Sequence, residues 1–219
     1  NTNWKNAMEN FNDWYHVPWV HRTLAPTSEV SNHVILQGPG MYAGFGTVPL
    51  SKGGSPADAD YLPPLSTLNE TEKKSAIFLH LFPNISLFLL PHHILSLVLT
   101  PVTPELTLES LDLFLPTETL EGAKDKNHLT DKIDTLFDFW DKVNVEDVVA
   151  CEQVQKGQKV KGYTGGPFSQ FEVMIHRLQG MVVESVVEDG KEKDFHSRYA
   201  TFYDEKACQE CHHYNNMRH

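Results

Sequence analysis

The spacing of apolar side chains divides the chain into an initial helix followed by a series of strands. Near the amino terminus apolar side chains recur at helical intervals, at Trp4, Met8, Phe11 and Tyr15. This spacing predicts a helix over about residues 3–16, capped by Thr2. Apolar and β-branched runs bounded by turn residues then predict six strands, at about 33–37, 41–48, 75–82, 85–90, 93–102 and 106–115. Their short, regular separations indicate an antiparallel meander.

Helical periodicity returns after a polar connector over residues 117–128. A helix is predicted from Thr130 or Asp131, with apolar positions at Ile133, Leu136, Phe137 and Trp140. Asn144 predicts the cap of a second helical segment, 145–155. After a glycine-rich loop, a last helix is predicted from Pro167 or Ser169 to about Leu178, and then a strand over 181–187. A helix, then strands, then helices is typical of an α+β fold.

Composition narrows the class of protein and its partners. The chain has 219 residues, of which 40% are hydrophobic and 21% charged, enough for one large domain or two small ones. A net charge of −11 argues against nucleic acid as a partner. The longest apolar run, residues 85–99, is interrupted by Pro91, His92 and His93, which argues against a membrane span. Three cysteines, an odd number, favour a reducing compartment, so we expect a cytoplasmic protein or one of an organellar stroma.

The first helix ends in a group of metal-binding side chains. Asp13, His16 and His21 follow the spacing D-x2-H-x4-H. On a continuous helix His21 would point away from the other two. Pro18 is expected to move Val17 out of helical conformation, so that the helix stops near His16 and His21 turns back beside it. Two converging imidazoles form half of a metal site, and a third ligand must come from elsewhere.

A distant carboxylate would complete this site. Two histidines and one carboxylate on one face of a metal ion are typical of non-haem Fe(II) that activates O2. The segment Asn-Val-Glu-Asp-Val-Val-Ala-Cys-Glu offers Asp147, with Glu146 and Glu152 as rivals, and spacing alone leaves the three open. Trp14 and Trp19, which flank the histidines, and His80 in the strand region are candidates for lining a substrate pocket.

Four segments of the sequence resemble one protein family. Residues 3–21 resemble the signature that opens the catalytic domain of Rieske-type non-haem iron oxygenase α subunits, and residues 146–157 resemble the segment that supplies the aspartate ligand. Phe-Pro-Asn at 82–84 and Phe-x3-Ile-His-Arg at 171–177 also look like family positions. The spelling is closer to the choline- and carnitine-monooxygenase branch than to the naphthalene type, although Val17 replaces a cysteine that is frequent in that branch.

The resemblance implies a fold, a ligand set and partners. The fold would be a helix-grip sheet and helices, with residues 1–180 as the catalytic domain and 181–219 as an extension. His16, His21 and Asp147 would bind Fe(II), and Asp13 would link this iron to the Rieske [2Fe–2S] cluster of a neighbouring subunit. The expected activity is O2-dependent hydroxylation of an aromatic or quaternary-amine small molecule. A reductase or ferredoxin would donate electrons, and the assembly would be a homotrimer.

The sequence departs from the complete family pattern in its cysteines. The Rieske cluster is bound by a C-x-H and a C-x2-H pair, whereas the chain has only Cys211 and His213 in C-x-H spacing, so the Rieske domain is expected to be missing or supplied by another subunit. The tail Cys208–His212 also matches C-x-x-C-H haem attachment, but its position near the end favours an ordinary reduced tail. The alternatives are a non-catalytic ligand-binding module of the same shape and a zinc hydrolase with Glu146 as base.

Overall fold

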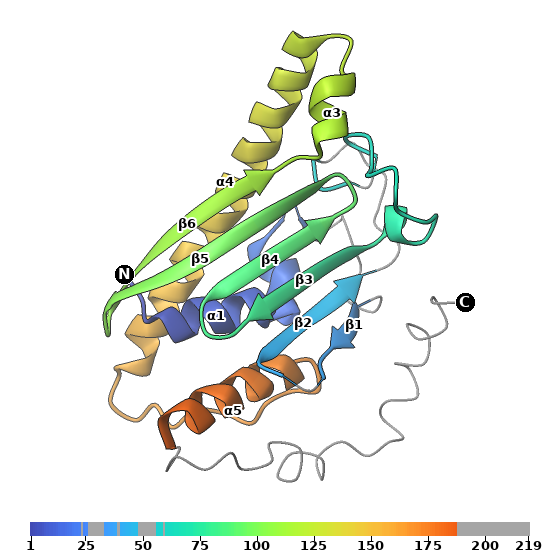
Figure 1. The fold of residues 1–219 in the computed structure, drawn as a ribbon. Coiled ribbons are helices and arrows are strands. Elements are labelled where there is room, and N and C mark those ends of the chain that lie inside the picture. Colours follow the sequence, from blue (N-terminus) through green and yellow to red (C-terminus); the bar gives the residue numbers. More distant parts are fainter. Residues whose placement is uncertain (23, 26–32, 39, 48–55, 59, 188–219) are drawn as a thin grey trace.

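A single antiparallel sheet organises the molecule. The computed structural model describes residues 1–22, 24–25, 33–38, 40–47, 56–58 and 60–187. The sheet contains six strands in chain order (Figure 1). They are β1 (His33–Leu36), β2 (Tyr42–Thr47), β3 (Ala76–Leu81), β4 (Ile85–Leu90), β5 (His93–Thr103) and β6 (Leu106–Phe114). The predicted meander is confirmed, and no strand end differs from its prediction by more than one residue.

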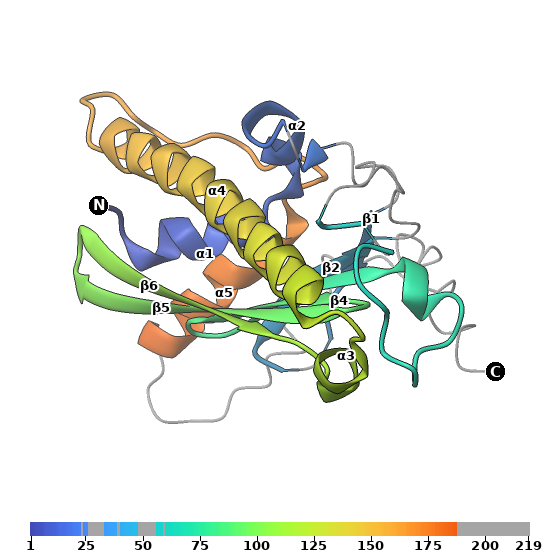
Figure 2. The same ribbon diagram turned by 90° about the horizontal axis from the view of Figure 1, so that it is seen from above.

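Helices cover one face of this sheet, with α4, α1 and α2 on the same side in Figure 2. The helical elements of the described residues that matter for the site are α1 (Trp4–Asn12), the 3₁₀ turn η1 (Trp14–His16), α2 (Val17–Val20), α3 (Thr117–Gly122), α4 (Lys126–Gln158) and α5 (Val173–Val187); a further 3₁₀ turn, η4 (Glu72–Lys74), precedes β3. The α+β class predicted from the element order is confirmed.

The helix-facing side of the sheet is aromatic at its centre. Phe45, Phe78 and Phe88 are partners in the register of β2, β3 and β4. The rings of Phe45 and Phe78 stack with centroids 4.7 Å apart, and Phe78 meets Phe88 edge to face at 5.6 Å. Along β5 every second side chain, from His93 to Leu99, is buried. The period-two alternation of these strands therefore builds the core and one wall of a cavity.

The first helix is shorter than predicted and is capped differently. It ends at Asn12, because Asp13 adopts an extended conformation and its carboxylate accepts a hydrogen bond from the backbone N–H of Tyr15 at 2.8 Å. Asn3, rather than Thr2, caps its amino terminus, while the Thr2 hydroxyl donates to the carbonyl of Cys151.

The expected effect of Pro18 on Val17 is wrong. Val17 is helical, with φ −50° and ψ −49°, and Pro18 stands in the first turn of α2. A residue without an N–H leaves no helical hydrogen bond unmade at that position. A 3₁₀ turn followed by one helical turn therefore returns His21 toward His16, instead of a break in the chain.

The two helical segments predicted on either side of Asn144 are one helix, α4. The Asn144 side chain does not cap a helix but donates to Glu109 Oε2 at 3.1 Å. Leu136, Trp140 and Val143 are buried in one core cluster, so packing continues along the helix toward Asn144 and outweighs the preference of asparagine for helix ends. The connector predicted over 117–128 is likewise mostly helical, since it contains α3 and the start of α4.

The strand predicted over residues 181–187 is also wrong, because these residues form the second half of α5. Met174, Leu178 and Met181 are fully buried at helical intervals and pack in the same cluster as Ala43 and Phe45 of β2. Tertiary burial of this stripe outweighs the local strand preference of the valines that follow.

Two further predictions concern a membrane span and the cysteine- and histidine-rich tail. No helix in the described ranges is both long and apolar enough to cross a membrane. Cys208, Cys211 and His212 lie outside the described residues.

Candidate metal centre

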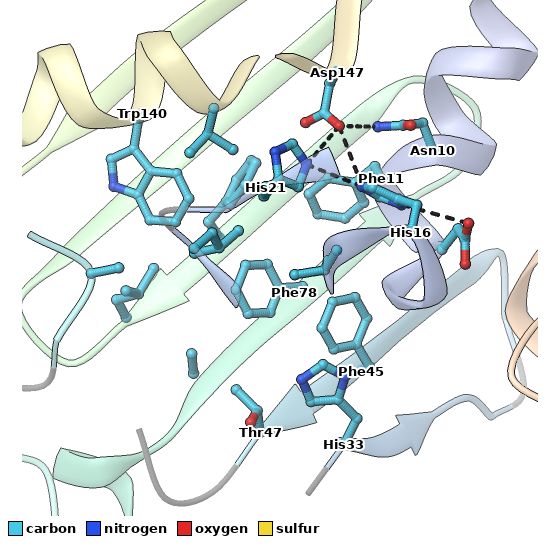
Figure 3. Close-up of a pocket in the computed structure, with 18 residues that line it drawn as sticks. Asn10, Phe11, His16, His21, His33, Phe45, Thr47, Phe78, Trp140 and Asp147 are labelled. Carbon is cyan, nitrogen blue, oxygen red and sulfur yellow. Dashed lines mark hydrogen bonds and ion pairs between the residues drawn. The ribbon is translucent and has the colours of Figure 1, made fainter. Parts of the chain in front are cut away.

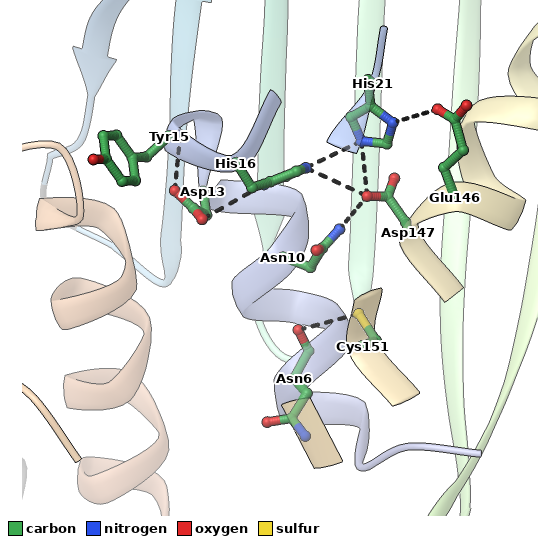
Figure 4. Close-up of polar contacts among 9 residues, drawn as sticks. All are labelled: Asn6, Asn10, Asp13, Tyr15, His16, His21, Glu146, Asp147 and Cys151. Carbon is green, nitrogen blue, oxygen red and sulfur yellow. Dashed lines mark hydrogen bonds and ion pairs between the residues drawn. The ribbon is translucent and has the colours of Figure 1, made fainter. Parts of the chain in front are cut away.

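Three side chains from distant parts of the sequence meet between α1, α2 and α4. His16 is the last residue of η1, His21 follows α2, and Asp147 lies within α4. Their facing atoms are His16 Nε2, His21 Nε2 and Asp147 Oδ1 (Figure 4). Of the three carboxylates that spacing left open, Asp147 is the one that reaches both Nε2 atoms. Glu152 instead accepts a hydrogen bond from the amino terminus at 2.9 Å.

The three donor atoms have the spacing of ligands on one face of an octahedron. His21 Nε2 lies 2.8 Å and His16 Nε2 3.3 Å from Asp147 Oδ1, and the two Nε2 atoms are 3.1 Å apart. Metal bonds of about 2.1 Å at right angles place neighbouring donors about 3.0 Å apart, whereas tetrahedral angles place them about 3.4 Å apart. The donor set therefore fits a metal ion with two nitrogen ligands, one oxygen ligand and further positions open.

A carboxylate lies beside the outer nitrogen of each imidazole, as a hydrogen-bond partner for His21 and as an ion-pair contact for His16. His21 Nδ1 lies 2.9 Å from Glu146 Oε2, and His16 Nδ1 lies 3.5 Å from Asp13 Oδ2. Metal-binding histidines commonly donate their second nitrogen to a carboxylate, which fixes the ring and the tautomer. Asp13, His16 and His21 are thus brought together as predicted. Glu146, a predicted rival ligand, faces the opposite side of His21.

The outer partners determine what the inner nitrogens can do. A carboxylate only accepts, so each neutral imidazole places its proton on Nδ1 and turns the lone pair of Nε2 inward. These two lone pairs face Asp147 Oδ1, which also accepts a hydrogen bond from Asn10 Nδ2 at 2.6 Å. Three electron-rich atoms within 3.3 Å of one another require a positive charge between them. A metal ion, or protons on the imidazoles, can supply it.

The pKa values of the three groups follow the same electrostatics. Burial opposes the charged form of His16, but Asp13 and Asp147 outweigh it and raise the pKa to about 9. Burial also opposes the charge of His21, and Asp147 and Glu146 nevertheless raise its pKa. For Asp147 burial favours the neutral acid, but the two histidines lower the pKa. The site therefore favours a positive charge beside the Asp147 carboxylate.

A cavity of about 70 Å³ opens beside these atoms. His16, His21 and Asp147 line one part of it, and an aromatic wall lines much of the rest (Figure 3). The described aromatic and imidazole side chains of that wall are Phe11, His33, Phe45, Phe78, Phe88 and Trp140. A largely apolar cavity with a few polar groups at one place is the usual form of a small-molecule site.

The structure places none of the three predicted pocket residues in the wall of this cavity. Trp14 is buried behind it, with its ring 5.1 Å from that of Phe45. Trp19 is 76% exposed on the short helix α2. His80 is buried two positions beyond Phe78 on β3, where Ser86 Oγ lies 2.8 Å from its Nδ1. Trp14 and Trp19 are close to the ligands in sequence, but they lie in two different short helical elements, η1 and α2. Their side chains therefore point in directions that the sequence spacing does not determine.

Two features of this site are not among the sequence predictions: the hydrogen bond from Asn10 to Asp147 and the contact of Glu146 with the outer nitrogen of His21. Adjacent residues on a helix point about 100° apart, so Glu146 and Asp147 cannot both face the same ion. That relation was readable in the sequence and assigns the two acids to different sides of His21. For Asn10, its position three residues before Asp13 gave no comparable signal, because the contact depends on how α1 packs against α4.

A helix-covered antiparallel sheet of this kind is the fold of Rieske oxygenase catalytic domains, as comparison with solved structures shows. Residues 1–188 match the family model of the ring-hydroxylating α subunit, catalytic domain. The chain belongs to this family, whose members are oxidoreductases. No curated protein sequence matches the chain.

The similar solved structures include several of the quaternary ammonium Rieske monooxygenase CntA. One, described as giving insights into carnitine oxidation by gut microbiota and inter-subunit electron transfer, has 18% identity and a TM-score of 0.60 and covers 85% of this chain and 47% of that chain. The complex with L-carnitine has 19% identity and a TM-score of 0.57, with coverages of 85% and 46%. At such identities the likeness concerns the fold. The chain spans about half the length of these proteins.

Proposed function

We propose that this chain is the catalytic part of a Rieske-type oxygenase, with Fe(II) bound by His16, His21 and Asp147. The reaction would be O2-dependent hydroxylation of a small aromatic or quaternary-amine molecule. The observation that carries the proposal is the donor triangle, whose edges of 2.8 to 3.3 Å join two imidazole nitrogens and one carboxylate oxygen. Ferrous iron with three such ligands on one face supplies O2 activation at its open positions.

The surrounding residues of the chain would hold this centre in place. Glu146 fixes the ring of His21 through Nδ1, and Asn10 fixes the Asp147 oxygen that faces both histidines. Both contacts set ligand direction before any ion enters, which lowers the cost of ordering the site. The aromatic wall built by Phe45, Phe78 and Phe88 would exclude water and hold an apolar part of the substrate beside the ligands.

Asp13 is the proposed electron bridge. Its carboxylate faces His16 Nδ1, the nitrogen opposite the one in the donor triangle, and its side chain is 20% exposed. It thus connects a ligand of the centre with the protein surface. A Rieske [2Fe–2S] cluster on a neighbouring subunit or on a further domain, reduced by a reductase or ferredoxin, would donate at this point. A homotrimer is the assembly we propose, and the inter-subunit electron transfer described for CntA supports this arrangement.

The zinc-hydrolase alternative is weakened by Glu146. A general base must face the water that a metal activates. Glu146 instead engages the outer nitrogen of His21 at 2.9 Å. The donor spacing is also closer to an octahedral face than to the tetrahedral arrangement that zinc prefers. A non-catalytic binding module would have no need for three converging metal donors. The donor set therefore favours the oxygenase over both alternatives.

The test is iron content followed by turnover. The full chain would be loaded anaerobically with Fe(II), desalted and assayed for metal, and we expect one iron per chain. Asp147→Ala should lose it, whereas Glu152→Ala, on the same helix but directed at the amino terminus, should keep it. The loaded chain should then consume O2 when a reduced Rieske protein and candidate substrates are supplied. An iron-free wild-type protein, or full iron in Asp147→Ala, contradicts the proposal.

A further inference from the structure

A buried hydroxyl without a partner lies in the wall of the cavity. Thr47 is the last residue of β2, is 1% exposed and lines the cavity. Its Oγ1 has no hydrogen-bond partner among the described residues. Buried polar atoms in native proteins are nearly always paired, so a lone hydroxyl indicates a partner that is not part of the fold. Valine has almost the same shape and would fill the position without this cost.

Thr47 lies at the other end of the cavity from the metal ligands. In Figure 3 the rings of Phe45 and Phe78 lie between the imidazoles of His16 and His21 and the position of Thr47. The register agrees, since Thr47 pairs with the first residues of β1 and β3 at the edge of the aromatic row. A molecule that reaches the metal ligands with one end would therefore place its other end near the Thr47 hydroxyl.

The described residues nearest to Thr47 carry no charge. Its neighbours in the strand register are His33 and Ala76, which also line the cavity. Burial lowers the pKa of His33 to about 4, so this imidazole is neutral at pH 7. No lysine or arginine occurs among the described residues of the cavity wall. Among the described residues a substrate carboxylate at this end would meet no opposite charge, and burying an unpaired charge is strongly unfavourable.

We propose that Thr47 is the anchor that determines substrate specificity, and that the cavity takes a small uncharged molecule. That molecule hydrogen-bonds to the Thr47 hydroxyl through one neutral polar group and presents an apolar part toward His16, His21 and Asp147. The inference rests on the proposed function in treating this cavity as the substrate site. It goes further in selecting uncharged substrates over carboxylates and over quaternary amines, which have no hydrogen-bonding group on the charged nitrogen.

Four probes that share a phenyl ring test the proposal: toluene, benzyl alcohol, benzoate and benzyltrimethylammonium. Their dissociation constants would be measured by ligand-observed NMR on the full chain without metal. We expect benzyl alcohol to bind most tightly. Thr47→Val, which keeps the shape, should weaken benzyl alcohol roughly three- to tenfold and leave toluene unchanged. Thr47→Ser, which keeps the hydroxyl, should bind benzyl alcohol within about twofold of the wild type.

Each contrary outcome overturns the proposal. Tighter binding of benzoate or of the quaternary amine would show a charged substrate site. Equal loss of all probes in Thr47→Val would indicate a general change of the cavity, and no binding by any probe would remove the site. Toluene binding and the melting temperature, which we expect to rise in Thr47→Val, report that the variants fold. Because neither iron nor turnover enters this measurement, its failure is distinguishable from failure of the iron assignment.

Discussion

Two pairs of histidines meet within the described part of the chain, and their surroundings shift the pKa values of the two pairs in opposite directions. His16 and His21 face each other through Nε2 atoms 3.1 Å apart, and His92 and His93 through Nδ1 atoms 2.8 Å apart. Burial lowers the pKa in every case, but carboxylates overcome it in the first pair and raise both values. In the second pair burial prevails and lowers both, to about 3 for His93.

The second pair forms a chain in which every proton has a place. The Trp140 indole N–H can only donate, and it donates to His93 Nε2 at 2.9 Å. His93 then carries its proton on Nδ1 and donates to His92, whose Nε2–H donates to the carbonyl of Asp58 at 2.8 Å. The chain is buried and neutral throughout. It fixes the Trp140 ring, which lines the cavity, without any position for a cation.

The difference lies in the outer partners. Both pairs are close and largely buried, so neither property identifies a metal site. A carbonyl and an indole at the two ends let donors and acceptors alternate along the second pair. Carboxylates at both ends of the first pair turn two lone pairs toward a third acceptor, Asp147. Whether a buried histidine pair can bind a metal ion is therefore best judged from the groups that contact the outer ring nitrogens.

The largest effect should come from removing a histidine of the first pair, because only that pair is proposed to bind metal. His21→Ala removes one donor of the triangle, and we expect Fe(II) affinity to fall more than about 100-fold, since even supporting residues change affinity by 10- to 100-fold. With Fe(II) at about 100 times the wild-type Kd, the wild type should gain about 2.7 kcal/mol of stability and His21→Ala almost none. Anaerobic thermal unfolding with and without Fe(II) measures this.

His92→Gln is the matched control for that measurement. It alters the other histidine pair and should retain the full metal-dependent rise in melting temperature. A loss of metal response in His92→Gln equal to that in His21→Ala would remove the distinction between the pairs.

Stability should respond in the reverse order. His93→Ala leaves the Trp140 N–H and His92 Nδ1 without partners and opens a cavity, and we expect the free energy of unfolding to fall by about 3 kcal/mol. Urea unfolding of the metal-free chain measures the change. The iron content of the folded variant should match the wild type. His128→Ala, at an exposed position of the same helix as Trp140, should change stability by less than about 0.5 kcal/mol. A similar loss in both variants would mean that the chain of hydrogen bonds contributes nothing.

A smaller effect should follow from the carboxylate behind His21. Glu146→Gln preserves size but removes the charge that holds the Nδ1 proton, so we expect a 10- to 100-fold weaker affinity for Fe(II) without complete loss. Competition with a metal-binding dye under anaerobic conditions gives the affinity. Glu152→Gln, whose carboxylate contacts the amino terminus, should leave affinity unchanged. If Glu146→Gln abolishes iron binding as completely as His21→Ala, Glu146 is a ligand and the outer role assigned to it is wrong.

The sheet could be predicted almost to the residue, because its strands are defined by local alternation and by turn residues. Helix ends could not. Asn144 has the local signature of a cap and lies inside α4, and residues 181–187 have strand preference and lie in α5. In both places the secondary structure is determined by the burial of an apolar stripe against elements distant in sequence. A local sequence pattern contains no information about that burial.

The metal centre and the cavity show the same limit: relations local in sequence could be predicted, and relations that depend on tertiary packing could not. Local spacing brought Asp13, His16 and His21 together, while Asp147 was one of three candidates until the family resemblance selected it. The contacts of Asn10 and the hydroxyl of Thr47 depend on how α1 meets α4 and on the register of β2. Such relations exist only in the folded chain, so residue types alone could not identify them.

The smallest effect concerns acid stability and a histidine that belongs to neither pair. His80 is fully buried and accepts from the Ser86 hydroxyl at Nδ1, while its Nε2–H donates to the carbonyl of Pro83 at 3.2 Å. Burial lowers its pKa to about 4. In the unfolded chain a histidine has a pKa of about 6.5. Between these values the unfolded state binds a proton that the native state does not, so stability is complete above about pH 6.5 and falls as the pH drops toward 4.

His80→Gln keeps a buried polar side chain but removes the titration. We expect the loss of stability between pH 6.5 and 4 to become shallower by up to about 1.4 kcal/mol per pH unit, one proton's share. Urea unfolding at half-unit pH steps measures this slope, and His128→Gln at an exposed position should leave it unchanged. An unchanged slope in His80→Gln would mean that His80 is protonated in the native state. The contrast between carboxylate-paired and carbonyl-paired histidines would then not extend beyond the two pairs, because a carbonyl partner and burial would not suffice to keep an imidazole neutral.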